Sequence, residues 1–303
     1  MQPRYARHAL ITLVAGLAGL GALIYFLHRK RPPEVHLPAW TPGDPGLPVD
    51  KWPTHSPGCA QSQLRSGRLA RTVRLGDRDR KFDLHIPRDH RPDRPLPLIF
   101  SFHGKRHLKN DFPDILVAAL LVGAGDKSIL AVPTGLTYGT DDPFLGWDER
   151  CDGPDMPFFD AMLADIETNL CINPRQVFAA GYSWGANMVD ALACCRGDRL
   201  RAVAPASGGW MGDNQRCPAR RLPAFRLTRG KNEPQHPVIF ESSVRFFRGA
   251  HGCTEATAPV HPPPCLEYQG CAQPVISCYY PEMGHTLPRD FGEATWGFFS
   301  RFH

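Results

Sequence analysis

The sequence predicts a single α/β domain whose mostly parallel sheet is covered by helices on both faces. Three observations support this fold class. Short apolar, β-branched runs alternate with helix-like runs from about residue 58 to residue 303, which is typical of parallel sheets. A length of 303 residues with 42% hydrophobic residues is sufficient for one large core. The 21% content of charged residues is that of ordinary globular proteins, which excludes disordered and coiled-coil classes.

The expected elements follow from apolar runs and their periods. The expected strands cover 71–75, 81–86, 96–102, 129–132, 176–180, 202–206, 224–228 and 275–280, and the expected helices cover 112–122, 158–170, 184–195, 240–247 and 291–302. Phe158, Met162 and Ile166, for example, recur with helical spacing. In such sheets, ligands bind outside the carboxyl ends of the strands, so we expect the functional site there.

The first 57 residues differ in composition from the rest. Residues 9–27 carry no charge and have basic residues on both sides, so residues 1–31 are expected to be a signal peptide or an uncleaved signal anchor. The apolar run ends without a small-residue cleavage site, which favours the anchor. Residues 32–57 contain eight prolines, which predicts an extended stalk before a domain at 58–303.

Ten cysteines follow the apolar segment. An even number of cysteines after an export signal indicates disulfides in an oxidising compartment, although spacing does not determine the pairing. The C-x-x-C pairs typical of zinc sites do not occur. The basic residues after the apolar segment favour a cytosolic body by themselves. Because the cysteines argue against it, we expect the body to be extracellular or in the secretory lumen, membrane-anchored by residues 9–27 if these are not cleaved.

The net charge of +5 comes from the N-terminus. Residues 1–31 hold five basic residues and no acidic one, so residues 32–303 hold 30 of each sign. A neutral body lacks the electrostatic footprint of a protein that binds phosphate backbones, which excludes nucleic acid as a partner.

The run Gly181-Tyr182-Ser183-Trp184-Gly185 is the strongest local motif. It matches G-x-S-x-G between an expected strand and an expected helix, an arrangement that exposes a serine Oγ on a sharp turn. Ser183 is therefore the candidate nucleophile. A serine hydroxyl needs a base, and the chain order in this fold is serine, acid, histidine. His285 follows Gly284 in the loop before the last expected helix, which makes it the candidate base.

The candidate acid is Glu233, in the loop after the expected strand 224–228. Its role would be to hold the neutral tautomer of His285 and to stabilise the imidazolium. Asp213, in the loop after Trp210, is the alternative that the sequence leaves open. His103 precedes the nucleophile in the chain, so we expect it to pack within the oxyanion loop rather than act as the base.

The oxyanion of an acyl transfer needs two donors. The motif predicts the backbone N–H of Trp184 as one donor and a backbone N–H near Lys105, after the strand 96–102, as the other. Trp147 and Trp210, with Trp184, are candidates for an aromatic acyl-binding pocket, with a place in the core as the alternative. No cofactor or metal is needed for this chemistry.

Five blocks of the sequence carry a family resemblance. They are Ser56-Pro57-Gly58-Cys59, the run at 98–104, the run at 169–173 before the serine motif, Gly284-His285-Thr286-Leu287-Pro288 and the run at 293–299. In this order, over about residues 56–302, they resemble the secreted feruloyl esterases and acetylxylan esterases related to polyhydroxybutyrate depolymerases. The resemblance implies an α/β-hydrolase fold and hydrolysis, through an acyl-serine, of feruloyl or acetyl esters on plant-wall polysaccharide.

The sequence also departs from the family pattern. Glu233 stands where the family usually has an aspartate, the loop after Gly104 is cationic rather than glycine-rich, and Trp184 with Gly185-Ala186 replaces the usual residues after the serine. Two alternatives therefore stay open. One is a polyhydroxyalkanoate depolymerase or general esterase with the same triad. The other, of a different class, is a non-catalytic, membrane-anchored relative that binds glycans or a partner.

Overall fold

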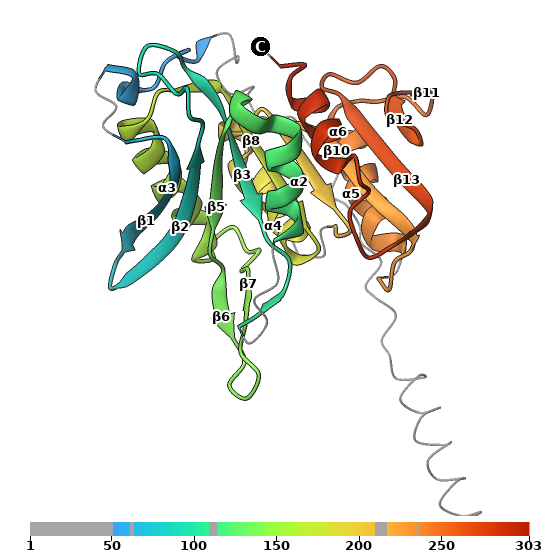
Figure 1. Ribbon diagram of the computed structural model, residues 1–303. Helices are drawn as coiled ribbons and strands as arrows, with labels where there is room; N and C mark the ends of the chain where they lie inside the picture. The colour runs from blue at the N-terminus through green and yellow to red at the C-terminus, as the bar shows by residue number, and fades with distance from the viewer. Residues whose placement is uncertain (1–50, 61–63, 109–113, 210–216, 236, 303) are drawn as a thin grey trace, which may run out of the picture. The chain divides into compact units, whose positions relative to one another are not determined.

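Ten strands form one sheet through the middle of the computed structural model (Figure 1). They are β1 (Gly67–Leu75), β2 (Arg78–Ile86), β3 (Leu96–Phe102), β5 (Ile129–Pro133), β8 (Ile172–Tyr182), β9 (Ala202–Ala206), β10 (Ala224–Asn232), β11 (Thr257–Pro259), β12 (Cys265–Tyr268) and β13 (Val275–Gly284). Their order in the sheet is β1-β2-β5-β3-β8-β9-β10-β13-β12-β11. The structure describes residues 51–60, 64–108, 114–209, 217–235 and 237–302.

The strands from β5 to β13 pair in parallel, and antiparallel strands flank them on both sides. The mostly parallel sheet predicted from the sequence is thereby confirmed. β10 and β13 run past their apolar parts, because they pair from Phe225 with Val275 to a last pair of Asn232 with Gly284, with a register shift between Gly230 and Asn232. Ladder hydrogen bonds do not depend on side-chain polarity, so both strands end later than their apolar runs.

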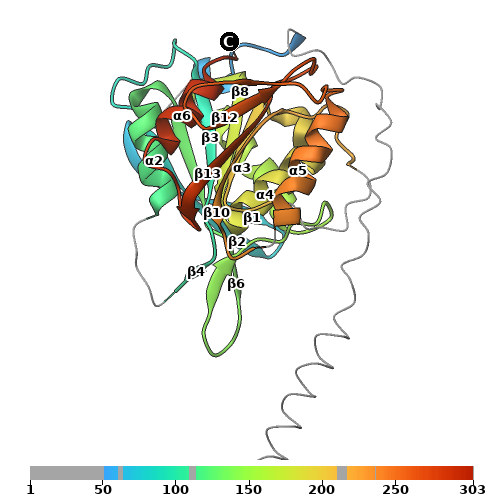
Figure 2. The same ribbon diagram turned by 90° about the vertical axis from the view of Figure 1, so that its right-hand side faces the viewer.

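Helices cover both faces of the sheet, as predicted. They are α2 (Ile115–Ala124), α3 (Asp155–Asn169), α4 (Trp184–Arg196), α5 (Pro237–Ala250) and α6 (Phe291–Phe299), with short 3₁₀ turns η2 (Pro57–Ala60), η3 (Gly125–Lys127) and η4 (Gly197–Arg199). α2 and α6 share one apolar cluster with Ile99, whereas α3, α4 and α5 share the other with Phe100. Adjacent residues of β3 thus face opposite layers, and Figure 2 shows the two sets of helices on either side of the sheet.

A second, small sheet was not predicted. It consists of β4 (Arg106–His107), β6 (Leu136–Tyr138) and β7 (Phe144–Gly146), in the order β4-β7-β6. The β6–β7 hairpin extends beyond the main sheet, near the carboxyl ends of β3 and β5 (Figures 1 and 2). Strands of two or three residues are too short to show an alternating pattern, so periodicity could not identify them.

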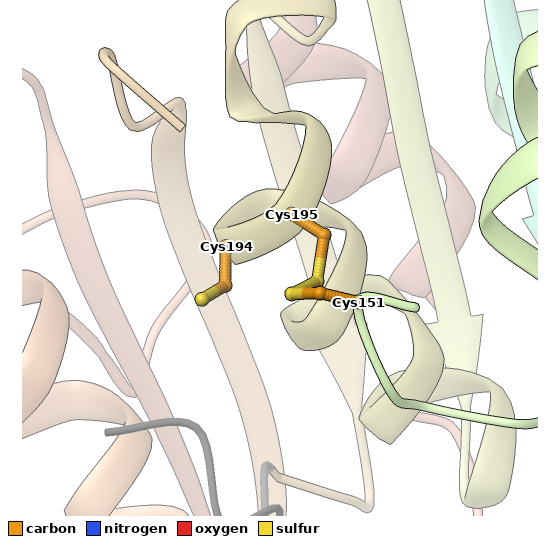
Figure 3. A group of neighbouring side chains, drawn as sticks. All are labelled: Cys151, Cys194 and Cys195. Atoms are coloured by element: carbon orange, nitrogen blue, oxygen red, sulfur yellow. A yellow bond between two sulfur atoms is a disulfide. The ribbon is translucent and has the colours of Figure 1, made fainter. Parts of the chain in front are cut away.

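All ten cysteines form disulfides, which confirms that prediction. The pairs are Cys59–Cys171, Cys151–Cys195, Cys194–Cys217, Cys253–Cys271 and Cys265–Cys278. The neighbours Cys194 and Cys195 lie at the end of α4 and belong to different bridges, and Figure 3 shows the bond from Cys195 to Cys151. The three sulfurs in that view lie within 4.8 Å of one another, but each is already bonded to another sulfur.

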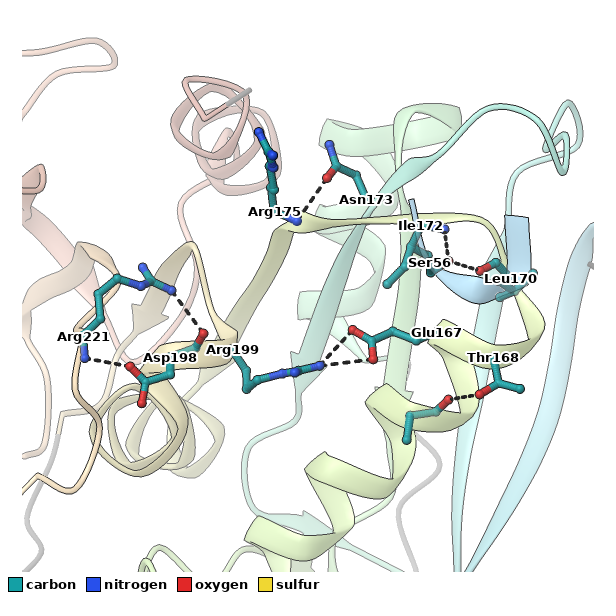
Figure 4. A network of polar contacts seen from close by, with 11 residues as sticks. Ser56, Glu167, Thr168, Leu170, Ile172, Asn173, Arg175, Asp198, Arg199 and Arg221 are labelled. Atoms are coloured by element: carbon teal, nitrogen blue, oxygen red, sulfur yellow. Dashed lines mark hydrogen bonds and ion pairs between the residues drawn. The ribbon is translucent and has the colours of Figure 1, made fainter. Parts of the chain in front are cut away.

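The N-terminal part of the described chain is attached to the ends of α3 and β8. Ser56 Oγ donates a hydrogen bond to the Leu170 carbonyl at 2.6 Å and accepts one from the Ile172 N–H at 3.0 Å (Figure 4). The carbonyl of Trp52 accepts a hydrogen bond from Arg175 at 2.7 Å. These contacts begin before residue 58, where the sequence placed the start of the domain.

A nearby ion pair and a hydrogen bond from a backbone N–H continue this network. Glu167 of α3 pairs with Arg199, and the Asp198 carboxylate accepts a hydrogen bond from the backbone N–H of Arg221 (Figure 4).

Among the residues that the structure describes, no helix has the length and apolar character to span a membrane. The expected membrane segment at residues 9–27 lies outside the described residues.

Candidate active site

Ser183 occupies a tight turn between β8 and α4, as the motif predicts. Its backbone has φ 54° and ψ −118°, a left-handed conformation that is unfavourable for a residue with a side chain. Glycine is needed on both sides of the turn. A Cβ on Gly181 would collide with the backbone of Gly185, and one on Gly185 would collide with the Phe102 carbonyl. The two glycines therefore let β8, α4 and the end of β3 meet closely around Ser183.

His285 and Glu233 lie beside Ser183. The Nε2 atom of His285 is 2.8 Å from Ser183 Oγ, and its Nδ1 atom is 2.6 Å from Glu233 Oε2. The adjacent parallel strands β10 and β13 place Glu233 and His285 together, because each residue directly follows the end of its strand. The structure thus brings together three side chains that are distant in the chain, since His285 lies 52 positions after Glu233 and 102 positions after Ser183.

The three side chains differ in exposure and in hydrogen bonding. The Glu233 side chain is only 2% exposed, whereas that of His285 is 27% exposed. Glu233 Oε1 also accepts the N–H of Gly230 at 3.3 Å, which orients the carboxylate. An ionised carboxylate can only accept, so it favours a proton on Nδ1 and leaves Nε2 to accept the Ser183 hydroxyl.

Two further hydrogen bonds hold the loop that carries His285. The Tyr182 hydroxyl donates to the His285 carbonyl at 2.7 Å, and Ser207 Oγ donates to the Thr286 carbonyl at 3.0 Å. Burial, together with the nearby charge of Glu233, raises the pKa of Tyr182 to about 12. The phenol therefore remains a hydrogen-bond donor across the neutral and mildly alkaline range.

The loop after β3 packs directly on the nucleophile. A Cβ on Gly104 would lie 3.1 Å from the Cβ of Ser183, and Lys105 follows Gly104. His103 supports this loop through both ring nitrogens, since Nδ1 donates to the Gly104 carbonyl at 2.6 Å and Nε2 accepts the Gly135 N–H at 3.0 Å. Burial lowers the pKa of His103, in keeping with a neutral ring. His103 therefore occupies the packing position expected from the sequence.

The tryptophans predicted to bind substrate have different locations. Trp147 is 2% exposed, packs edge-to-face on Phe102, and donates its indole N–H to the His103 carbonyl at 2.8 Å. The expectation that it lines an acyl pocket is corrected here, because its ring belongs to the core and supports the loop after β3. Trp210 and the alternative acid Asp213 lie outside the described residues.

Two residues that the sequence analysis missed lie beside Trp184. The Glu149 carboxylate accepts a hydrogen bond from Asn187 Nδ2 at 3.2 Å. Burial raises the pKa of Glu149. Asn187 Oδ1 in turn accepts the Gly209 N–H at 3.0 Å. Asn187 lies one helical turn after Ser183, a spacing that could have indicated it, whereas Glu149 stands in a loop and belongs to no motif.

No protein-family model matches the chain. Several feruloyl esterases are similar in sequence. The probable feruloyl esterase C of Aspergillus niger is 30% identical over 269 residues, which cover 81% of this chain and 91% of that protein. Feruloyl esterase D of Neurospora crassa is 28% identical over 285 residues, with 85% and 94% covered. Feruloyl esterase C of Emericella nidulans is 29% identical over 262 residues, with 81% and 91% covered.

Solved structures show the same fold at low sequence identity. The acetyl xylan esterase from Aspergillus awamori gives a TM-score of 0.60 at 14% identity, over 77% of this chain and 99% of that one. The feruloyl esterase module from Clostridium thermocellum gives 0.50 at 10% identity, over 88% and 94%. Together with the sequence relatives, this fold defines a serine carboxylic ester hydrolase of the α/β-hydrolase class. Within that class, the chain belongs to the feruloyl esterase family.

Proposed function

We propose that the protein hydrolyses feruloyl or acetyl esters of plant cell-wall polysaccharides through an acyl-enzyme at Ser183. One observation carries the catalytic part of this proposal. Ser183 Oγ, His285 and Glu233 form a continuous chain of contacts of 2.8 and 2.6 Å at the carboxyl ends of the parallel strands. Such an array generates a nucleophile from a hydroxyl that is weak by itself. The substrate class rests on the relatives, which are named feruloyl and acetyl xylan esterases.

The reaction proceeds in two stages. Ser183 Oγ attacks the ester carbonyl while His285 Nε2 takes its proton, and His285 then gives that proton to the leaving alcohol. Water then attacks the carbonyl of the acyl-serine, with His285 again taking and returning the proton. This step releases the carboxylic acid and regenerates Ser183. Glu233 stabilises the imidazolium in both stages and stays ionised. Its bond to Nδ1 supports it as the triad acid over Asp213.

The negative charge that develops on the carbonyl oxygen needs donors in place. We assign them to the backbone N–H groups of Trp184, at the start of α4, and of Lys105. The close approach of Gly104 to Ser183 supports the second assignment, because it brings the loop after β3 to the nucleophile. His103 and Trp147 support that loop through hydrogen bonds, so its donor is oriented before the reaction begins.

The five disulfides support an extracellular site of action. We propose that residues 9–27 direct export of the chain, either as a cleaved signal or as an anchor. Expression in a secreting eukaryotic host and N-terminal sequencing of the product distinguish the two. A new N-terminus in the region of residues 28–50 means cleavage, and a membrane-bound chain with an intact N-terminus means an anchor.

The test of the activity compares the full chain with its Ser183→Ala variant. Methyl ferulate, p-nitrophenyl acetate, acetylated xylan and hydroxybutyrate oligomers are the substrates, and a fluorophosphonate reports the nucleophile. We expect hydrolysis of the ferulate or the acetylated xylan, and loss of hydrolysis and labelling in Ser183→Ala. Ser242→Ala, on α5, serves as the matched serine control.

Two results would overturn the proposal. Hydrolysis of hydroxybutyrate oligomers alone would identify a polyester depolymerase. A folded wild-type chain that neither reacts with the fluorophosphonate nor hydrolyses any ester would identify a non-catalytic binding protein.

A further inference from the structure

A groove outside the active site lies between α5 and the strands β10, β13 and β12, which are neighbours in the sheet (Figure 1). Its volume of about 310 Å³ is within the range of small-molecule sites. The charged residues that line it are Arg229, Glu241, Arg245 and Arg248, three arginines and one glutamate, which leaves a net charge of +2. Because residues 32–303 carry equal numbers of basic and acidic residues, this groove is a local concentration of positive charge.

The guanidinium of Arg229 is enclosed by aromatic rings rather than by acids. It lies 5.2 Å from the centroid of the Phe240 ring and 4.5 Å from that of Tyr279, and its side chain is only 16% exposed. Its contact with the largely exposed Glu241 is 3.8 Å long, which is beyond hydrogen-bond distance. A guanidinium presents five N–H donors. In the described part of the chain no hydrogen bond engages those of Arg229, so they are available to an anion.

Arg248 and Arg245 add donors from α5. They are three residues apart and therefore lie on the same side of the helix. The Arg248 guanidinium lies 4.3 Å from the centroid of the Tyr268 ring and pairs with the exposed Glu255. Its Nε is buried and has no hydrogen-bond partner among the residues that the structure describes. A buried donor without an acceptor is unfavourable, and a bound anion would relieve this cost.

We propose that this groove, which we call the arginine groove, binds the carboxylates of acidic sugars in a polysaccharide. The planar guanidinium matches a carboxylate with two parallel hydrogen bonds. The side chains of Arg229, Arg245 and Arg248 come from two elements, so neighbouring carboxylates of one oligomer can pair along the groove. The hydroxyl of Ser277 on β13 also lines it and suits the hydroxyl groups of a sugar. The identity of the ligand rests on the proposed polysaccharide substrate.

The arginine groove is close enough to the active site for one polymer to reach both. Arg229 precedes Glu233 by four residues, and Glu233 directly follows β10, which corresponds to about 13 Å along an extended strand. A polymer held in the groove by its carboxylates therefore presents an ester on a neighbouring unit to Ser183 at an increased local concentration. The groove should lower KM for acidic polymers and leave the chemical step unchanged.

The test measures binding by isothermal titration calorimetry in the full-length Ser183→Ala chain, which does not consume an ester. The probes are trigalacturonate, neutral xylotriose, and sodium acetate and sodium sulfate as simple anions. We expect trigalacturonate to bind, with an affinity that falls as salt is added, and xylotriose not to bind in the groove. Binding of acetate or sulfate as tight as that of trigalacturonate would overturn the sugar as the ligand and leave an adventitious ion only.

Substitutions locate the site. Arg229→Gln and Arg248→Gln should each weaken trigalacturonate binding roughly 10-fold, since each removes charge-assisted hydrogen bonds. Arg245→Gln changes an exposed residue and should weaken binding without affecting folding, which keeps the test valid if Arg229→Gln does not fold. Arg78→Gln, at an exposed position of β2, is the matched control for the loss of one positive charge.

The outcomes separate this inference from the proposed function. Trigalacturonate that fails to bind, that binds no better than xylotriose, or that binds equally well to the folded groove variants would overturn the arginine groove. All the groove variants should keep the wild-type kcat/KM for methyl ferulate, which carries no carboxylate. A wild-type chain that binds trigalacturonate but hydrolyses no ester would contradict the proposed function instead.

Discussion

The phenolic oxygen of Tyr182 donates a hydrogen bond of 2.7 Å to the backbone carbonyl of His285. Tyr182 is the last residue of β8 and immediately precedes Ser183, so the strand that presents the hydroxyl also fixes the loop of the imidazole. The distance between Ser183 and His285 is therefore set by a bond from the neighbour of Ser183 to the backbone of His285, as well as by the sheet.

Replacing Tyr182 with phenylalanine removes this bond and keeps the ring, whose centroid lies 5.2 Å from that of His285. A neutral hydrogen bond contributes about 1 kcal/mol, so we expect kcat on a reactive ester to fall roughly 5-fold with KM unchanged. Tyr280→Phe is the control, because the Tyr280 hydroxyl has no hydrogen-bond partner in the described part of the chain. An unchanged kcat in Tyr182→Phe would show that the sheet alone positions His285.

Glu233→Gln should abolish most of the activity. An amide in this position stabilises the wrong histidine tautomer, and losses of about 10⁴-fold in kcat accompany the equivalent change in a serine protease triad. Glu282→Gln controls for the loss of an exposed carboxylate three residues before His285. Steady-state kinetics at neutral pH provide the measurement. Near-wild-type activity in Glu233→Gln, combined with inactivity in Asp213→Asn, would assign the acid to Asp213.

Glu149→Gln should change how stability depends on pH. Burial raises the pKa of Glu149, so the folded state binds this proton more tightly than the unfolded state does. The contribution of Glu149 to stability is then complete below the ordinary carboxyl pKa and is lost as the pH rises through the raised value. Relative to wild type, the Gln variant should gain thermal stability as the pH rises from about 4, the ordinary carboxyl pKa, into the neutral range.

Thermal unfolding monitored by circular dichroism across this range measures the difference. Glu293→Gln, which removes an exposed carboxylate from α6, controls for the change in net charge. A difference in Tm that is constant with pH, or that shifts in favour of wild type as the pH rises, would contradict the expected linkage.

The Cys59–Cys171 bridge should stabilise the fold more than the Cys265–Cys278 bridge. Their cysteines are 112 and 13 positions apart. Closing the longer loop removes more entropy from the unfolded chain, roughly 5 kcal/mol against roughly 3 kcal/mol at 25 °C. Chemical denaturation of the two double-alanine variants tests the order, and a greater loss on removal of Cys265–Cys278 would show that local packing outweighs loop entropy.

Much of the main sheet could be predicted because its central strands are short, apolar and separated by helices. β3 and β9 cover the residues expected for them, and the turn at Ser183 was identified by a motif whose glycines have a direct steric reason. His285 and Glu233 were identified by the loops that follow two expected strands, and the structure places both beside Ser183.

What the sequence could not show depends on contacts between distant segments. The strands of the small sheet are too short for a period, so the contacts of Tyr138 and Phe144 with Trp184 were not foreseen. Glu149 belongs to no motif, and its hydrogen bond with Asn187 exists only after the loop folds onto α4. Trp147 was expected beside the substrate because large aromatic residues suit both pockets and cores, and composition does not distinguish the two.

The adjacent cysteines at the end of α4 have a practical consequence for recombinant production. Cys194 and Cys195 differ by one position, and the sulfurs of Cys151, Cys194 and Cys195 gather within 4.8 Å, so a mispaired bond needs only a small displacement. Synthesis in a reducing bacterial cytosol would leave the choice of partner to uncatalysed air oxidation after lysis. A host with an oxidising folding compartment and a disulfide isomerase is therefore the appropriate source of homogeneous material.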